Sequence, residues 1–132
     1  MVKEIVPATA IPTYAGEKDR IHIGNRVHLG SPYFNTRSGH IYVGDDTFIG
    51  LDVHLLTGTH IRKDGRAQRH GVPDSGRDIY IGKGCWIANK VIIIGPVKIG
   101  DYCVIGAGSI VTNDIPNGKF VCGESAKIRG DI

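Results

Sequence analysis

Aliphatic residues recur at six-residue intervals along the second half of the chain. A second apolar or small residue comes two positions before each of them. The six aliphatic positions are Ile81, Ile87, Ile93, Ile99, Ile105 and Val111. A period of six fits neither an amphipathic helix, whose period is about 3.6, nor the strict alternation of a hairpin meander. It indicates the hexapeptide repeat of a parallel β-helix, in which both members of each pair point inward and a corner follows.

The same pairing continues upstream in the same phase. Five further pairs occupy it: Ile21/Ile23, Val27/Leu29, Ile41/Val43, Thr47/Ile49 and Val53/Leu55. Glycine often follows the second member, where a chain that turns a corner needs a small residue. Three hexads make a triangular coil of about 18 residues, so residues one coil apart stack at the spacing of neighbouring strands, about 4.8 Å. The pattern predicts about four coils, over residues 21–42, 43–60, 81–98 and 99–116.

Two segments break the phase, residues 31–40 and the longer 61–78, and the second predicts a loop that protrudes from the solenoid. The 132 residues are enough for one domain and too few for two ordinary ones. We expect an all-β domain over residues 21–116. Residues 1–20 and 117–132 should cap its ends, because bare strand edges promote aggregation.

Composition excludes several functions. The net charge of +3, with acids and bases interspersed, is too weak to predict binding to nucleic acid. No apolar stretch approaches the length of a membrane span, about 18 residues, and no signal peptide is evident. Two of the three cysteines, Cys85 and Cys103, take inward positions, where free cysteine behaves as a small hydrophobe. We therefore expect a cytoplasmic protein without membrane insertion.

Large apolar residues are also predicted on the outside of the solenoid. Three outward columns follow from the register: Phe48, Trp86 and Val104; His54, Ile92 and Ile110; and His60 with Lys98. Stacked apolar residues on an outer face are unfavourable in a monomer, and a symmetric oligomer would bury them. A three-sided prism favours a homotrimer, with clefts where two prisms meet.

His60 is the candidate for chemistry, because it lies where the repeat ends and the long loop begins. If Leu55 and Thr59 point inward, His60 points outward at a corner. Imidazole titrates near neutral pH and so suits a general base. Metal binding is the competing use, as in the γ-class carbonic anhydrases, which need three converging histidines. His54 and His60 are six residues apart and face different sides, so we predict no metal site.

Several stretches of the chain, taken together, resemble the hexapeptide-repeat acyltransferases. They are "LLTGTH" before the long loop, "IGKGCWIANKVIIIGPVKIGDYCVIGAGSIVTNDIP" after it, and "CGESAKIRG". They are most similar to the branch of galactoside/maltose O-acetyltransferases and polysaccharide-modifying acetyltransferases. The resemblance implies a left-handed β-helix, a homotrimer with active sites between subunits, and acetyl-CoA as the acyl donor without a metal. It also implies that His60, which ends the coil before the loop, is catalytic.

Further site residues are implied by the same resemblance. Asn35, in "YFN", would contact the acceptor, and Trp86 would lie beside the acceptor near the thioester. The family's CoA contacts fall on the last coils and the tail, which in this sequence are Asn89, Ala107, Thr112, Asn113, Lys127 and Arg129. The family often has Ser or Gly in place of Asn89 and Lys in place of Asn113.

The function that the resemblance implies is acetyl-CoA-dependent O-acetylation of a sugar or glycan precursor, in polysaccharide biosynthesis. In direct transfer, His60 would take the proton from an acceptor hydroxyl as it attacks the thioester. N-acetylation of a nucleotide-linked amino sugar is the alternative within the same class. A γ-carbonic-anhydrase-like zinc enzyme and a non-catalytic solenoid scaffold are the alternatives from other classes. Stoichiometric zinc in the purified protein would favour the zinc enzyme, and absence of CoA binding would favour the scaffold.

Overall fold

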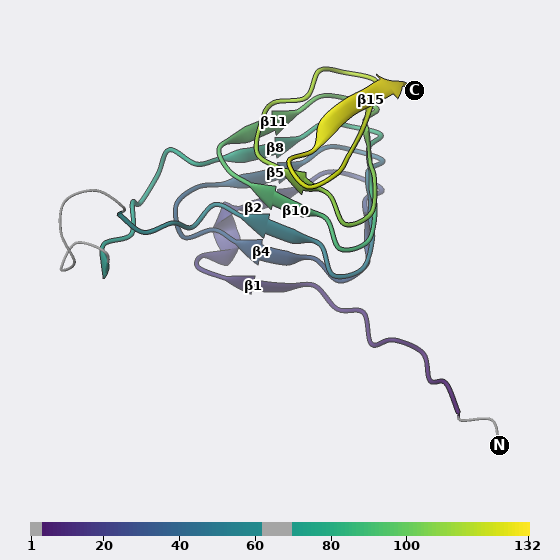
Figure 1. Ribbon diagram of the computed structural model, residues 1–132. Helices are drawn as coiled ribbons and strands as arrows, with labels where there is room; N and C mark the ends of the chain where they lie inside the picture. Colours follow the sequence, from purple (N-terminus) through teal and green to yellow (C-terminus); the bar gives the residue numbers. More distant parts are fainter. Residues whose placement is uncertain (1–3, 62–69) are drawn as a thin grey trace.

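A computed structural model shows a three-sided solenoid of stacked parallel strands, with a loop that protrudes from one corner (Figure 1). The structure describes residues 4–61 and 70–132. Face A holds β1 (Thr13–Ala15), β4 (Tyr33–Asn35), β7 (His54–Leu56), β10 (Ile92–Ile94) and β13 (Ile110–Val111). Face B holds β2 (Ile21–Ile23), β5 (Ile41–Val43), β8 (Ile79–Ile81) and β11 (Val97–Ile99). Face C holds β3 (His28–Leu29), β6 (Phe48–Ile49), β9 (Trp86–Ile87), β12 (Val104–Ile105), β14 (Lys119–Cys122) and β15 (Lys127–Asp131).

The inward positions predicted by the six-residue period form the core. The aliphatic residues from Ile81 to Val111 that keep this period are at most 2% exposed. Cys85 and Cys103, two positions before members of this series, are equally buried. Each buried aliphatic side chain contributes on the order of 1.5–3 kcal/mol to folding. The parallel β-solenoid and its inward register are therefore confirmed.

Two of the predicted outward columns are also confirmed by the strand pairing. On face C, Phe48 pairs with Trp86 and Trp86 with Val104. On face A, His54 pairs with Ile92 and Ile92 with Ile110.

The solenoid is longer than the repeat predicts, with five turns in place of about four. Strand β1 lies within residues 1–20, and it pairs with β4, which lies within the predicted interruption at 31–40. Strand β14 lies within residues 117–132 and pairs in parallel with β12, while β15 covers its edge as an antiparallel strand. The repeat pattern misses the early turns because polar residues take inward positions there. Thr36 and Ser38 are 1% and 0% exposed.

The corner between faces A and B varies in length far more than the corner that follows it. From a face A strand to the next face B strand, the chain runs from Thr13 to Ile21, Tyr33 to Ile41, His54 to Ile79, and Ile92 to Val97. These steps are 8, 8, 25 and 5 residues long. The step from face B to face C is 7 residues in each of the same turns. Extra chain therefore leaves the solenoid at the A–B corner, where the loop of residues 61–78 begins.

This insertion changes the register predicted for His60. Thr57 is the residue buried at the corner, at 0% exposed, whereas Thr59 is half-exposed. Lys98 pairs with Tyr80 on face B, so the predicted column of His60 with Lys98 is wrong. The chain has already left the coil at His60. It re-enters the coil after the loop, where β8 pairs directly with β5.

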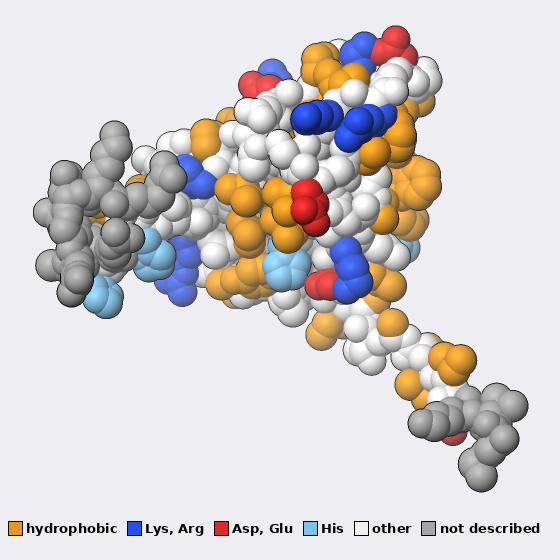
Figure 2. Space-filling view, in the orientation of Figure 1, with side chains coloured by type: hydrophobic (Ala, Val, Ile, Leu, Met, Phe, Trp, Pro, Cys, Tyr) orange, Lys and Arg blue, Asp and Glu red, His pale blue; other side chains and the backbone are white. Residues whose placement is uncertain are grey.

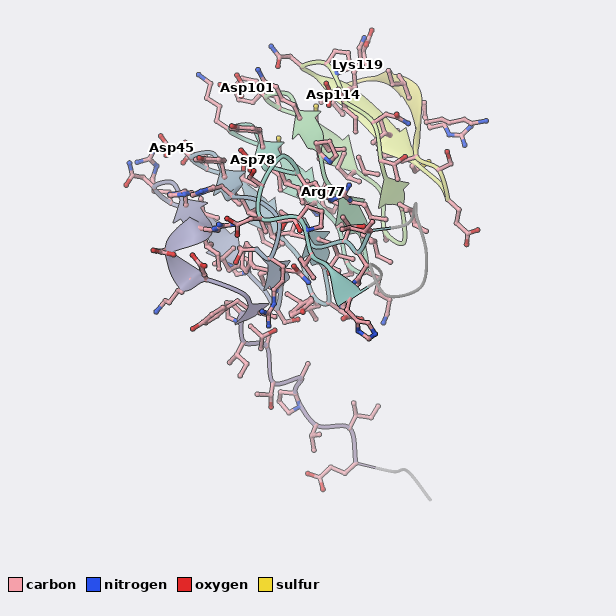
Figure 3. All side chains as sticks on the ribbon, turned by 90° about the vertical axis from the view of Figure 1, so that its left-hand side faces the viewer. Asp45, Arg77, Asp78, Asp101, Asp114 and Lys119 are labelled. Atoms are coloured by element: carbon pink, nitrogen blue, oxygen red, sulfur yellow. The ribbon has the colours of Figure 1, made fainter. Side chains whose placement is uncertain are left out.

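Glycine at other corners makes room for an Asp or Asn from the next turn. The Oδ1 atoms of Asp45, Asn89, Asp101 and Asn117 accept from the backbone N–H groups of Asn25, Leu51, Lys83 and Asp101, respectively, at 2.7–3.0 Å. The residues before these donors are Gly24, Gly50, Gly82 and Gly100. A Cβ at any of these glycines would lie 2.3–2.4 Å from the accepting Oδ1. Asp45 and Asp101 are seen along one edge of the prism in Figure 3.

Substitution of Gly50 tests this corner. The change Gly50→Ala should lower the free energy of unfolding by about 1–3 kcal/mol, measured by urea denaturation, because its Cβ would displace the Asn89 amide. The other neighbours of that Cβ are at 3.1 Å or beyond. In the Asn89→Ala background, Gly50→Ala should therefore cost clearly less than in the wild type, since only these backbone contacts remain, and additive losses would contradict the explanation.

Candidate active site

His60 lies between two open clefts at the A–B corner, and its side chain is exposed. The first cleft has a volume of about 730 Å³, and its lining includes Asn35 and Asp74. The second has a volume of about 630 Å³, and its lining includes Arg77 and Thr112. An imidazole that borders both clefts can exchange a proton with a molecule bound in either one.

Asn35 is held at the first cleft by two backbone amides. Its Oδ1 accepts from the N–H groups of Arg37 at 3.1 Å and Gly58 at 3.2 Å. A Cβ at position 58 would lie 2.5 Å from this oxygen, so any larger residue two positions before His60 would displace the Asn35 amide. Within residues 4–61 and 70–132, no protein group accepts from Nδ2 of Asn35. This amide group is left as a donor for a molecule in the cleft.

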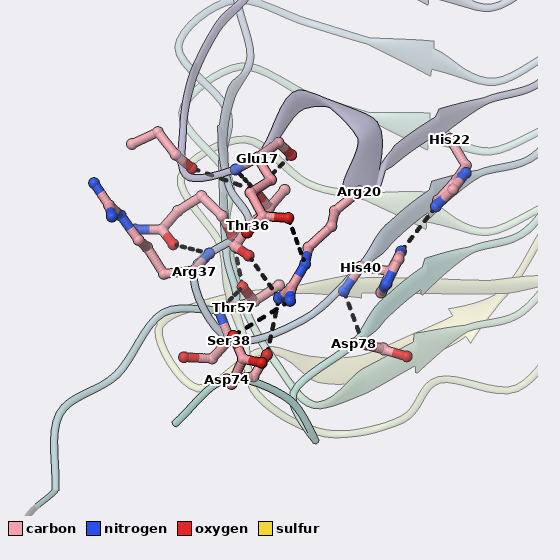
Figure 4. A network of polar contacts seen from close by, with 12 residues as sticks. Glu17, Arg20, His22, Thr36, Arg37, Ser38, His40, Thr57, Asp74 and Asp78 are labelled. Carbon is pink, nitrogen blue, oxygen red and sulfur yellow. Dashed lines mark hydrogen bonds and ion pairs between the residues drawn. The ribbon is translucent and has the colours of Figure 1, made fainter. Parts of the chain in front are cut away.

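Buried threonine hydroxyls fix the chain that presents His60 (Figure 4). Thr57 Oγ1 donates to the carbonyl of Asn35 at 2.8 Å and accepts from the N–H of Ser38 at 3.1 Å. Thr36 Oγ1 donates to the carbonyl of Glu17 at 2.9 Å and accepts from its N–H at 2.8 Å. These bonds join three successive turns and satisfy polar groups that burial would otherwise penalise.

Arg77 supports the second cleft at the point where the loop rejoins the solenoid (Figure 3). Its Nε donates to the carbonyl of Thr57 at 2.7 Å, and its backbone N–H donates to the carbonyl of Ser38 at 3.2 Å. Thr112 follows β13 on face A and reaches the same cleft from two turns further along.

Most of the other histidines have side-chain partners on the solenoid surface, so a structural role accounts for them. His22 and His40 share a hydrogen bond of 2.9 Å, His54 contacts Asp52 at 3.3 Å, and His28 stacks on Phe48 with ring centroids 4.4 Å apart. Within the part of the chain that the structure describes, the ring of His60 has no hydrogen-bond partner.

The structure brings only some of the predicted site residues together. Asn35 and Thr112 each share a cleft with His60, and Asn113 follows Thr112, with its Nδ2 3.4 Å from Thr112 Oγ1. Trp86 is 53% exposed on face C and lines neither cleft.

The remaining predicted CoA residues lie elsewhere on the same chain. Asn89 and Ala107 are in turns between faces C and A, and the Asn89 oxygen already bonds Leu51. Lys127 and Arg129 are exposed on β15 at the C-terminal end.

Four charged residues at the two clefts were missed by sequence reasoning. Glu17, Arg37 and Asp74 line the first cleft and Arg77 lines the second. Glu17 lies in a segment interpreted as a cap, and Asp74 and Arg77 lie in a loop with no repeat to place them. The step of eight residues from Tyr33 to Ile41 is a signal that could have placed Arg37 at a protruding corner.

Cys85 and Cys103 lie in the core and line neither cleft. Burial raises the pKa of the Cys85 thiol to about 11. Among the described residues, no three His, Cys, Asp or Glu side chains come together as a metal site would require. The same residues include no helix with the length and apolarity needed to cross a membrane.

Comparisons with known proteins agree with this architecture. The family model "Bacterial transferase hexapeptide (six repeats)" matches residues 78–113. The chain is 36% identical over 129 residues to nodulation protein L of Rhizobium meliloti, covering 96% of this chain and 69% of that protein. It is 32% identical over 126 residues to the galactoside O-acetyltransferase of Escherichia coli, covering 92% and 59%. A solved structure, a galactoside acetyltransferase in complex with coenzyme A, aligns with a TM-score of 0.82 at 31% identity, over 95% of this chain and 62% of that one.

The solenoid and its corner loop define a hexapeptide-repeat protein. The chain belongs to the hexapeptide-repeat acetyltransferase family. It spans 52–59% of the length of three curated relatives that it matches, the Escherichia coli enzyme among them.

The burial of two cysteines predicts a simple labelling pattern. In the folded protein at pH 8, a thiol-disulfide reagent should react first with Cys122, which is half-buried, and slowly with Cys85 and Cys103. At a pKa of about 11, only about one Cys85 thiol in a thousand is ionised at that pH, and the thiolate is the reactive form. All three should react rapidly in denaturant. Rapid reaction of Cys85 in the native state would contradict its place in the core.

Proposed function

We propose that this protein is an acetyl-CoA-dependent O-acetyltransferase of a sugar or glycan precursor, with His60 as the general base. One observation carries the proposal: His60 has no partner among the described residues and borders two clefts. Asn35, which the family resemblance assigns to the acceptor, lines the first cleft, and Thr112, which it assigns to CoA, lines the second. The relatives named as galactoside acetyltransferases support the same class of acceptor.

The reaction that fits this arrangement is direct transfer. The acceptor hydroxyl lies in the first cleft, where Asn35 Nδ2 can donate to an oxygen of the sugar. Neutral His60 removes the hydroxyl proton as the oxygen attacks the thioester carbonyl of acetyl-CoA in the second cleft. The carbon–sulfur bond then breaks, the acetyl group stays on the acceptor oxygen, and the thiolate takes the proton from His60. No residue is acylated, and His60 returns to its neutral form.

A homotrimer is part of the proposal. Phe48 and Trp86 are 46% and 53% exposed in one column on face C, and Figure 2 shows hydrophobic side chains gathered over face A. Packing of one prism against another would cover such columns. Because Trp86 lines neither cleft of its own chain, it would approach the thioester from a neighbouring subunit. The remaining CoA contacts that the family resemblance implies also stay part of the proposal. They are Asn89, Ala107, Asn113, Lys127 and Arg129.

The free thiols suggest where the protein works. Cys85, Cys103 and Cys122 are all free thiols, as is usual for proteins of a reducing compartment. We therefore place the reaction in the cytoplasm.

The change His60→Ala tests the catalytic assignment. Acetyl transfer from acetyl-CoA to methyl β-galactoside and to a panel of sugars and amino sugars should fall by at least about 10²-fold, because the proton acceptor is lost. The affinity for CoA by calorimetry and the mass in solution by light scattering should stay unchanged.

His22→Ala is the matched control, since His22 is exposed on face B and lines neither cleft. It should retain wild-type turnover. Near-normal turnover in His60→Ala would remove His60 from the mechanism, and absence of CoA binding by the wild-type protein would favour a scaffold.

A further inference from the structure

Arg20 joins three parts of the chain that meet at the first cleft (Figure 4). It ends the short 3-10 helix η1 (Lys18–Arg20) in the first turn of the solenoid. Its Nη1 donates to the carbonyl of Thr36 at 3.3 Å and to the carbonyl of Asp74 at 2.8 Å. Its Nη2 is 3.4 Å from Asp74 Oδ1, and its Nε is 3.5 Å from Glu17 Oε2. One guanidinium therefore connects the first turn, the second turn and the limb that returns from the long loop.

The burial of this group makes it the fixed member of the cluster. The Arg20 side chain is 15% exposed, whereas those of Glu17 and Asp74 are 64% and 92% exposed. A guanidinium withdrawn from water keeps its hydrogen bonds, because leaving its donors unpaired costs free energy. Its shortest contact goes to a main-chain carbonyl 54 residues away in sequence. Arg20 therefore fixes the path of the backbone at Asp74 as well as one side chain.

Arg20 acts on the wall of the first cleft and does not reach the space inside it. Its partners Glu17, Thr36 and Asp74 all line the first cleft, as does Val72 on the same limb. Arg20 itself does not line that cleft, and among the described residues no hydrogen bond or ion pair joins it to His60 or Thr112. Its influence on a bound molecule must therefore act through the residues that it holds.

We propose that Arg20 is a positioning residue for the acceptor: it holds residues 72–74 against the first turn and so completes the wall of the acceptor cleft. This inference rests on the proposed function, because it assigns the first cleft to the acceptor. The second cleft shares Pro73 and Ser75 with this limb, but the rest of its lining, including Ile94 and Thr112, comes from parts of the chain that have no hydrogen bond to Arg20. Loss of Arg20 should therefore weaken acceptor binding more than the binding of acetyl-CoA, because Arg20 bonds three residues of the first cleft and none of the second.

Arg20→Gln is the test, with steady-state kinetics on methyl β-galactoside or the best acceptor of the panel. The KM for the acceptor should rise about tenfold, the size expected for loss of a charged contact that orders a binding wall. The kcat should stay within about twofold, and the KM for acetyl-CoA should rise by no more than about threefold, because the second cleft shares only Pro73 and Ser75 with this limb. Arg20→Lys, which keeps the charge with fewer donors, should be intermediate. Asp74→Ala should be milder than Arg20→Gln, because the main-chain contact survives.

Arg26→Gln is the matched control. Arg26 also pairs with an aspartate of the next turn, Asp46, at 2.7 Å, but it is 68% exposed and lines neither cleft. Its kinetics should equal those of the wild type. Equal rises in the acceptor KM for Arg20→Gln and Arg26→Gln would show a general loss of stability and overturn the proposal.

Amide hydrogen exchange gives a readout that needs no activity. Exchange at residues 70–76 should quicken in Arg20→Gln and stay unchanged in Arg26→Gln. Unchanged exchange in Arg20→Gln would show that Arg20 does not hold the limb, and faster exchange with an unchanged acceptor KM would show that the limb does not serve the acceptor. If the wild-type protein transfers no acetyl group, the proposed function fails, while exchange still decides whether Arg20 holds the limb.

Discussion

Parallel stacking of successive turns is the constraint on which the rest of this structure depends. Each turn must bring its three strands back under those of the turn before, with inward aliphatic residues such as Ile93 and Ile105 in register. Residues that exceed the repeat can leave only at a corner, because inside a strand they would shift every following side chain to the other face. The A–B corner absorbs the long insertion between His54 and Ile79. The fold thereby confines irregular, polar chain to one edge of a rigid prism.

The candidate site follows from that confinement. At the A–B corner, aliphatic packing no longer fixes the chain. The buried hydroxyls of Thr36 and Thr57 fix it there through hydrogen bonds to backbone carbonyls of adjacent turns. His60, three residues past Thr57, is exposed yet attached to a fixed base. Such an arrangement suits a proton-transfer group, which must reach its substrate without losing its orientation. Under the proposed function, the two clefts that His60 borders would give the donor and the acceptor separate places.

The core and its repeat could be predicted from the sequence because hydrophobic burial imposes a period that depends only on local spacing. His60 became the candidate for a related reason, since it marks where that period ends, and its catalytic role stays a prediction. The early turns were hidden because Thr36 and Ser38 replace aliphatic residues at inward positions. The walls of the first cleft could not be predicted, because the contact of Arg20 with Asp74 joins residues 54 apart through a loop without any repeat. Local patterns carry no information about such a closure.

The most direct test of the central claim is a crystal structure with acetyl-CoA bound. If His60 mediates transfer between the two clefts, the thioester should lie in the cleft with Thr112, its carbonyl carbon within about 4–5 Å of the His60 ring, leaving space for an acceptor hydroxyl between them. Acetyl-CoA bound with its thioester at another face of the prism, far from every copy of His60, would contradict the account.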